Sequence, residues 1–208
     1  INKMLRSSSA IACLAVGASA TIHYGKCPRY LRLYEFDIHR FMGTWYEISK
    51  DKFNIDEIGA SCTTVNFTLQ PNGYITVYNR ALEPVRGYIK SAGKGIESQV
   101  TALGSLVIDY EGMPAVDQPG NFNILETDYE NYALVYNCQA KSRFGFSMRN
   151  ESFSILARSQ SLSDDLLAQL AEQTKSYLPN YDYDSNVRRI IQGGECEYAP
   201  NPPAEFLQ

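Results

Sequence analysis

Short stretches in which apolar and polar residues alternate follow one another along most of this chain. The clearest two, residues 61–70 and 73–81, flank Pro71-Asn72-Gly73, where asparagine and glycine accept the positive φ angles of a tight turn. This arrangement is typical of an antiparallel hairpin. Similar stretches, rich in Tyr, Val, Ile and Thr, are residues 44–49, 85–92, 105–111, 122–128, 132–138 and 153–159. The pattern therefore predicts eight antiparallel strands.

One segment near the C-terminus has helical spacing instead. Ser163 can cap a helix, two aspartates follow it at the positive end, and Pro179 ends the segment. Leu166, Leu167 and Leu170 recur at helical intervals, which indicates a face packed against the rest of the protein. Eight strands followed by one helix predict an all-β fold, an eight-stranded antiparallel up-and-down β-barrel with the C-terminal helix packed on its outside. The interior of such a barrel has room for one small ligand.

The connections between the predicted strands alternate in length. Those after the second and sixth strands are short, and those after the first, third, fifth and seventh tend to be longer, so one end of the barrel should be closed and the other open. Residues 51–60, 111–120 and 139–151 are predicted to surround the open end. Residues 93–104 are an exception, because they form a long connection where the scheme requires a tight turn.

Residues 1–20 have the composition of a secretory signal peptide. Lys3 and Arg6 precede an apolar run at 10–18, and Ala18-Ser19-Ala20 has the small residues of a cleavage site. Met4 would then be the natural start. The apolar run is shorter than the roughly 20 residues that cross a bilayer. The segment therefore predicts a secreted, extracellular protein without stable membrane insertion.

The net charge of the mature chain limits which partners it can bind, and its cysteine content indicates disulfides. Removal of residues 1–20 takes away one lysine and one arginine, which leaves 17 basic side chains against 23 acidic ones and a formal charge of −6. This balance argues against nucleic acid or an anionic membrane as partner. The four remaining cysteines, Cys27, Cys62, Cys138 and Cys196, predict two disulfides in an oxidising compartment, and their spacing leaves three pairings open.

Neither metal binding nor a catalytic motif is indicated. No two cysteines have CxxC spacing, and His23 and His39 are the only histidines, so we predict no metal site. Neither histidine falls within a predicted strand, and we assign no catalytic residue. Asn66 and Asn150 each begin an Asn-x-Ser/Thr sequence, which predicts glycosylation at both.

Several motifs together give the chain a family resemblance. Gly43-Thr44-Trp45, residues 127–138 and residues 155–158 resemble the three signature segments of the lipocalins. The Gly25-Lys26-Cys27-Pro28 segment and the sequence around Asn66 are similar to lipocalins of the apolipoprotein D and invertebrate bilin-binding type. The resemblance implies a lipocalin domain over 21–196, and residues 197–208 then form a Pro-rich tail.

The resemblance also implies structural roles for particular residues. In this family the tryptophan of the first motif, here Trp45, plugs the closed end of the barrel, and the arginine of the third, here Arg158, lies across it. Pairing of the apolipoprotein D type implies disulfides between Cys27 and Cys138 and between Cys62 and Cys196.

Alternation within the strands then predicts which residues line the barrel lumen. A glycan on Asn66 must point outward, so the residues on either side of Asn66 should point into the lumen. If Trp45 and Arg158 point inward, every second residue of their strands should do so as well. Asn79 matches a polar residue that helps to orient ligand in this family. The predicted lumenal residues are Glu47, Val65, Phe67, Leu69, Ile75, Val77, Asn79, Ser154 and Leu156.

These features favour a carrier that sequesters a small hydrophobic ligand and requires no cofactor. Ser154 and Phe122-Asn123 stand where apolipoprotein D has tryptophan and a Tyr-Trp pair, so a steroid-like or arachidonate-like specificity does not transfer. A roomier and more polar pocket suits a bilin such as biliverdin or a carotenoid, with a fatty acid or sterol as alternatives. Either chromophore would be bound as cargo.

Two other classes of function remain open. A lipocalin-fold enzyme acting on a lipid would need a free lumenal thiol, and the four cysteines leave none over if all are paired. A protein-binding lipocalin of the defence or signalling type is the other alternative. The sequence also leaves open a homo-oligomer and a cell-surface receptor as partners.

Overall fold

The computed structural model describes residues 21–27, 33, 35–52, 59–101, 103–143 and 146–198. The predicted signal peptide, residues 1–20, lies outside the described residues, and so do residues 199–208 of the predicted tail.

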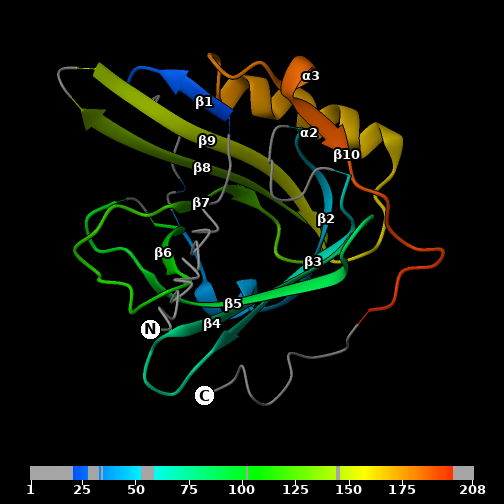
Figure 1. Cartoon of the computed structure of the whole chain (residues 1–208), viewed down its shortest axis with the longest axis horizontal. Coiled ribbons are helices and arrows are strands. Elements are labelled where there is room, and N and C mark those ends of the chain that lie inside the picture. Colours follow the sequence, from blue (N-terminus) through cyan, green and yellow to red (C-terminus); the bar gives the residue numbers. More distant parts are fainter. Residues whose placement is uncertain are drawn as a thin grey trace, which may run out of the picture.

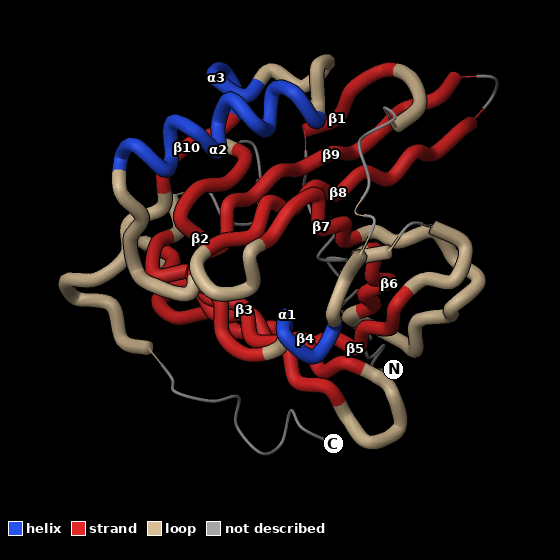
Figure 2. The backbone as a smooth tube through the Cα atoms, turned by 180° about the vertical axis from the view of Figure 1, so that it is seen from behind, coloured by secondary structure: helices blue, strands red, loops and turns tan. Residues whose placement is uncertain are grey.

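Eight antiparallel strands form a closed barrel. Each strand pairs with the next along the chain, and the last pairs back with the first. The strands curve round in a ring in Figure 2. They are β2 (Gly43–Asp51), β3 (Ser61–Leu69), β4 (Ile75–Glu83), β5 (Gly87–Glu97), β6 (Ser105–Asp109), β7 (Phe122–Thr127), β8 (Tyr132–Arg143) and β9 (Phe146–Ala157). The predicted eight-stranded barrel is therefore confirmed.

The long helix α2 (Asp164–Tyr177) packs on the outside of this barrel, as Figure 1 shows. Its N-cap is Ser163, whose side chain accepts a hydrogen bond from the backbone N–H of Leu166. Leu167 and Leu170 are buried in a cluster with residues from the outer face of β8 and β9, among them Leu134 and Ile155. The predicted C-terminal helix is thus confirmed, and the short helix α3 (Tyr183–Asn186) follows it.

Two short strands flank the seam where the barrel closes. β1 (Thr21–Tyr24) pairs with β9, and β10 (Val187–Arg189) pairs with β2. Ser49 and Lys50 pair with β9 on one edge of β2 and with β10 on the other. β10 therefore lies beside β2 on the edge from which β3 has diverged.

The chain after β10 continues to fill the space between β2 and β3. The backbone N–H of Ile190 donates to the carbonyl of Ile48, and the N–H of Cys62 donates to the carbonyl of Ile191. Nε2 of Gln192 donates to backbone carbonyls of both strands, at 2.9 Å and 2.8 Å. Strands as short as β1 and β10 have too few residues for a detectable alternation. Contrary to our prediction, one of the two histidines, His23, lies in a strand, β1.

The two ends of the barrel differ in their connections, with some departures from the predicted lengths. The predicted long connection over residues 93–104 is shortened to residues 98–104 at the closed end, because residues 93–97 continue β5. The connection between β4 and β5 is short, because these strands pair as far as Glu83 and Gly87. At the open end, residues 139–151 do not form the predicted loop. β8 and β9 instead stay paired as far as Arg143 and Phe146, and β1 pairs with the same part of β9.

Two disulfides join the ends of the described chain to the barrel. Cys27, in the N-terminal arm, is bonded to Cys138 of β8, and Cys196, beyond β10, is bonded to Cys62 of β3. These are the pairs that the family resemblance implies. The second bridge fixes the segment that fills the space between β2 and β3.

We expect the double variant Cys62→Ala/Cys196→Ala to lose about 4 to 5 kcal/mol of unfolding free energy, because this bridge closes a loop of more than 100 residues in the unfolded chain. Urea titration of both proteins, followed by the fluorescence of the single tryptophan, measures the difference. Unchanged unfolding free energy, or a peptide map that joins Cys27 to Cys62, would contradict the pairing.

Candidate functional site

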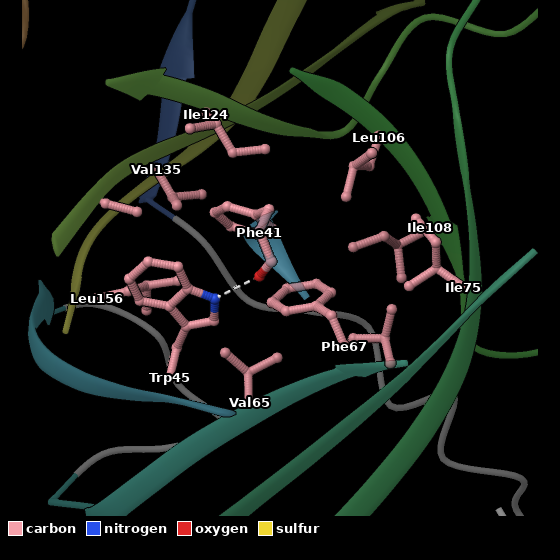
Figure 3. Close-up of a cluster of buried hydrophobic side chains, with 12 residues drawn as sticks. Phe41, Trp45, Val65, Phe67, Ile75, Leu106, Ile108, Ile124, Val135 and Leu156 are labelled. Carbon is pink, nitrogen blue, oxygen red and sulfur yellow. Dashed lines mark hydrogen bonds between the residues drawn. The ribbon is translucent and has the colours of Figure 1, made fainter. Parts of the chain in front are cut away.

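An aromatic plug closes one end of the barrel. The short helix α1 (Ile38–Phe41) lies across this end, with its N-terminus capped by Asp37. Phe41 and Trp45 are both completely buried, with ring centroids 5.1 Å apart. The indole Nε1 donates a 2.9 Å hydrogen bond to the carbonyl of Phe41, drawn as a dashed line in Figure 3. Trp45 thus has its polar atom satisfied within an apolar environment.

Arg158 holds this plug in place from outside. Its Cζ lies 3.7 Å from the centre of the Trp45 ring, a cation–π contact. The guanidinium also donates to the backbone carbonyls of Arg40, Met42, Thr44 and Tyr129 at 2.9 to 3.1 Å.

Burial lowers the pKa of Arg158 to about 10, and the carboxylate of Asp128 opposes that shift. The side chain therefore stays charged at neutral pH. Its five donors tie α1, β2 and the turn before β8 together. This arrangement agrees with the structural role that the resemblance implies for Trp45 and Arg158.

Apolar side chains from strands all round the barrel meet in its interior (Figure 3). Five of the predicted lumenal residues belong to this buried cluster: Val65, Phe67, Ile75, Val77 and Leu156. A sixth, Leu69, is partly buried and packs against the cluster. The cluster also contains residues that we did not predict, namely Phe41, Leu106, Ile108, Ile124, Ala133 and Val135. The alternating pattern within residues 105–111 and 132–138 could have identified four of these residues: Leu106, Ile108, Ala133 and Val135.

Phe67 connects the plug to the wall of the barrel. Its ring centroid lies 5.2 Å from that of Phe41 and 5.4 Å from that of Phe122. Since Phe67 is 1% exposed, its ring is part of the continuous apolar surface above Trp45.

One wall of the interior has a neutral polar group centred on Asn79. Nδ2 of Asn79 lies 2.7 Å from the hydroxyl of Tyr110 and 3.5 Å from Oγ of Ser91. Tyr110 is half exposed; desolvation of its phenol raises the pKa of that group, and the hydrogen bond from Asn79 opposes the shift. The phenol is therefore uncharged at neutral pH, and the whole group carries no charge.

Gly93 gives Tyr110 its place in this wall. A Cβ atom at residue 93 would lie 2.8 Å from the carbonyl oxygen of Asp109 and 2.9 Å from Cδ1 of Tyr110. A side chain there would push Tyr110 away from Asn79. The glycine is thus required for close approach of the ring to β5.

The opposite wall has a charged group formed by β2 and β9. Ser154 donates a 2.7 Å hydrogen bond to Oε1 of Glu47, and Nζ of Lys50 lies 2.8 Å from Oε2 of the same carboxylate. The side chains of Lys50 and Glu47 are only 6% and 10% exposed. We predicted Glu47 and Ser154 as lumenal but missed Lys50, because strict alternation from Trp45 places residue 50 outside.

The two predicted glycosylation sites lie in different settings. Asn66 is on the outer face of β3, since both of its chain neighbours are in the inner cluster, and its Nδ2 donates to Oγ1 of Thr44. Asn150 lies in β9 between β1 and β8, on the same side of the strand as Ser154. Glycosylation of either residue remains a prediction.

A closed antiparallel barrel with a plugged end, an apolar interior and polar groups on two walls defines a small-molecule-binding barrel. Residues 36–188 match the family described as "Lipocalin-like domain". The chain therefore belongs to the lipocalin family.

Its relatives include vertebrate and insect proteins. The chain is 33% identical to rabbit (Oryctolagus cuniculus) apolipoprotein D over 126 residues, which are 60% of this chain and 64% of that protein. It is 29% identical to the Lazarillo protein of Schistocerca americana over 175 residues, 83% of this chain and 78% of the relative. The match thus spans less than two thirds of that apolipoprotein D.

The fold is also similar to that of solved lipocalins. The structure of insecticyanin from the tobacco hornworm Manduca sexta superposes with a TM-score of 0.65 at 24% identity, covering 86% of this chain and 94% of that one. At this level of identity the likeness concerns the fold alone.

We expect Trp45→Ala to lower the free energy of unfolding by about 3 to 5 kcal/mol, because it removes a fully buried ring and leaves Arg158 without its aromatic partner. Trp45→Phe, which keeps a ring and loses the N–H donor, should lose less. Urea unfolding followed by circular dichroism compares the three proteins. A Trp45→Ala protein of native stability but altered ligand selectivity would show that Trp45 contacts ligand.

Proposed function

We propose that this protein is a secreted carrier that binds one small hydrophobic molecule in the barrel lumen. The observation that carries the proposal is the inner apolar cluster, to which seven of the eight barrel strands contribute buried residues above the aromatic plug. Burial of apolar ligand surface against such walls contributes about 25 cal/mol per Å². A few polar groups on the walls then fix the orientation of the ligand.

The polar groups on both walls support a ligand that is not a plain hydrocarbon. Asn79 and Tyr110 provide neutral hydrogen-bonding atoms on one side, and Glu47, Lys50 and Ser154 provide charged and hydroxyl groups on the other. A bilin such as biliverdin or an oxygenated carotenoid has a long apolar framework with polar atoms spaced along it. These classes fit better than a saturated fatty acid or a sterol.

The state of the cysteines supports a carrier and not an enzyme with a thiol nucleophile. All four cysteines of the described residues are in disulfides, and a thiolate is the species that attacks in such chemistry. Disulfides also persist mainly in oxidising compartments, which supports secretion. Across the described residues, every helix is too short or too polar to span a bilayer.

We expect Phe67→Ala and Asn79→Leu each to weaken ligand binding by about 1 to 3 kcal/mol, through lost apolar contact in the first and an unpaired polar ligand group in the second. The control is Thr64→Ala, which changes an outward residue of the same strand as Phe67 and keeps the Asn66 sequon intact. Biliverdin, a carotenoid and a fatty acid are titrated against all four proteins.

The pattern across these variants decides the assignment. A one-residue error in register would exchange the two faces of the strand. Loss of binding in Thr64→Ala with native affinity in Phe67→Ala and Asn79→Leu, all three folded, would therefore refute a lumenal site on these strands.

A further inference from the structure

The inner face of β5 has very small side chains. Gly95 and Gly93 pair with Ile75 and Val77 of β4, both of which belong to the inner cluster. A Cβ atom on Gly95 would lie 3.5 Å from side-chain atoms of Val77 and of Ile108 in β6. Ile75 and Ile108 lie beside each other there in Figure 3. The wall is therefore recessed at β5, and side chains of the two neighbouring strands lean over it.

Tyr110 covers the next part of this recess, toward the open end. It follows β6 directly and lies two residues beyond Ile108, so it continues the inner face of that strand. One edge of its ring faces Gly93, where a Cβ atom would lie 2.9 Å from Cδ1 and 3.1 Å from Cε1. The hydroxyl reaches Nδ2 of Asn79, at 2.7 Å, on the far side of β5. The ring thus spans β5 and is held both at one edge and at its hydroxyl.

Half of the Tyr110 side chain nevertheless remains exposed. Over the part of the chain that the structure describes, no other aromatic ring packs against it, whereas Phe41, Trp45 and Phe67 at the plugged end contact one another. An exposed ring on the wall of an apolar lumen is a contact surface for a ligand. Because the position of this ring is already fixed, packing a ligand on it costs little conformational entropy.

We propose that Tyr110 is a stacking platform that selects a conjugated, planar cargo over a saturated one. This proposal rests on the proposed carrier function and specifies the chemical class of its ligand. An aromatic ring attracts another π-system in an offset or edge-to-face arrangement, and this attraction adds to the gain from apolar burial. A saturated chain gains only from burial. Bilins and carotenoids are conjugated along most of their length, whereas sterols and saturated fatty acids are not.

Two carboxylic acids of equal chain length test the proposal, because they share a head group and differ in conjugation. trans-Parinaric acid contains a conjugated tetraene, and stearic acid is saturated. Binding of parinaric acid is measured by its own fluorescence, and binding of stearic acid by displacement of parinaric acid. We expect the wild type to bind parinaric acid about three- to tenfold more tightly than stearic acid, which is the contribution of one aromatic contact.

Tyr110→Leu keeps an apolar side chain and removes the ring. It should weaken binding of parinaric acid about three- to tenfold and change the affinity for stearic acid by less than about twofold. Tyr110→Phe keeps the ring and loses only the hydroxyl, so its affinity for parinaric acid should stay within about twofold of the wild type. The matched control is Tyr74→Leu, in the turn between β3 and β4 at the plugged end, which should change neither affinity.

Three results would refute the platform and leave the carrier function intact. The first is equal affinity of the wild type for the two acids. The second is an equal change in both affinities, or no change, in Tyr110→Leu. The third is equal weakening by Tyr110→Phe and Tyr110→Leu, which would assign the effect to the hydroxyl. Tyr110→Ile is a second replacement of the same kind if Tyr110→Leu does not fold.

A failure of the carrier function itself has a different signature. Neither acid would then bind to the wild type, and biliverdin and the carotenoid would also remain unbound. If biliverdin alone binds, Tyr110→Leu should weaken its binding about three- to tenfold, and an unchanged affinity would refute the platform.

Discussion

The pairing of β2 with β9 is the constraint on which the rest of this structure depends. It closes the sheet into a barrel, and it places Trp45 and Arg158, which lie at adjoining ends of these two strands, in contact. The same pairing contains a β-bulge in β2, in which Ile48 is an extra residue. Closure, the plugged base and the charged group in the lumen are therefore three results of one strand register.

The interior combines two requirements that normally conflict. Apolar residues must fill enough of the barrel to stabilise it, and polar groups must remain to recognise a ligand. The plug of Phe41 and Trp45, with Phe67 packed against it, meets the first requirement at one end. The bulge meets the second nearer the open end, because it brings Lys50 to the inner face, where it pairs with Glu47, whose other oxygen accepts from Ser154.

Much of this architecture was predictable from the sequence, for identifiable reasons. The hairpin around Asn72-Gly73 and the cap at Ser163 have strong local signals. Alternation placed Val65 and Phe67 inside once the predicted glycan on Asn66 was taken to point outward, and Val77 followed from its parity with Asn79. The disulfide pairing was available only through the family resemblance, since spacing alone left three choices.

What the sequence did not reveal depends on tertiary context. The bulge has no signature in the residues around Ile48, so Lys50 was placed on the wrong face. Residues 139–143 and 146–151 form paired strands even though they have few apolar residues, because β1 and the bridge at Cys138 support them. β10 is recognisable only from its partners, β2 and the chain near Cys62.

The two disulfides also determine how a pulling force would pass through the molecule. From Cys27 the chain runs through α1 and β2 to Cys62, where the bridge leads directly to Cys196. This is the shortest covalent route between the two ends of the described chain. Tension applied at those ends would extend that stretch first and leave β4 to β7 outside the taut path. With both disulfides intact, the stretch from Cys27 to Cys62 carries the tension, and the chain between Cys62 and Cys196 forms a closed loop outside this path.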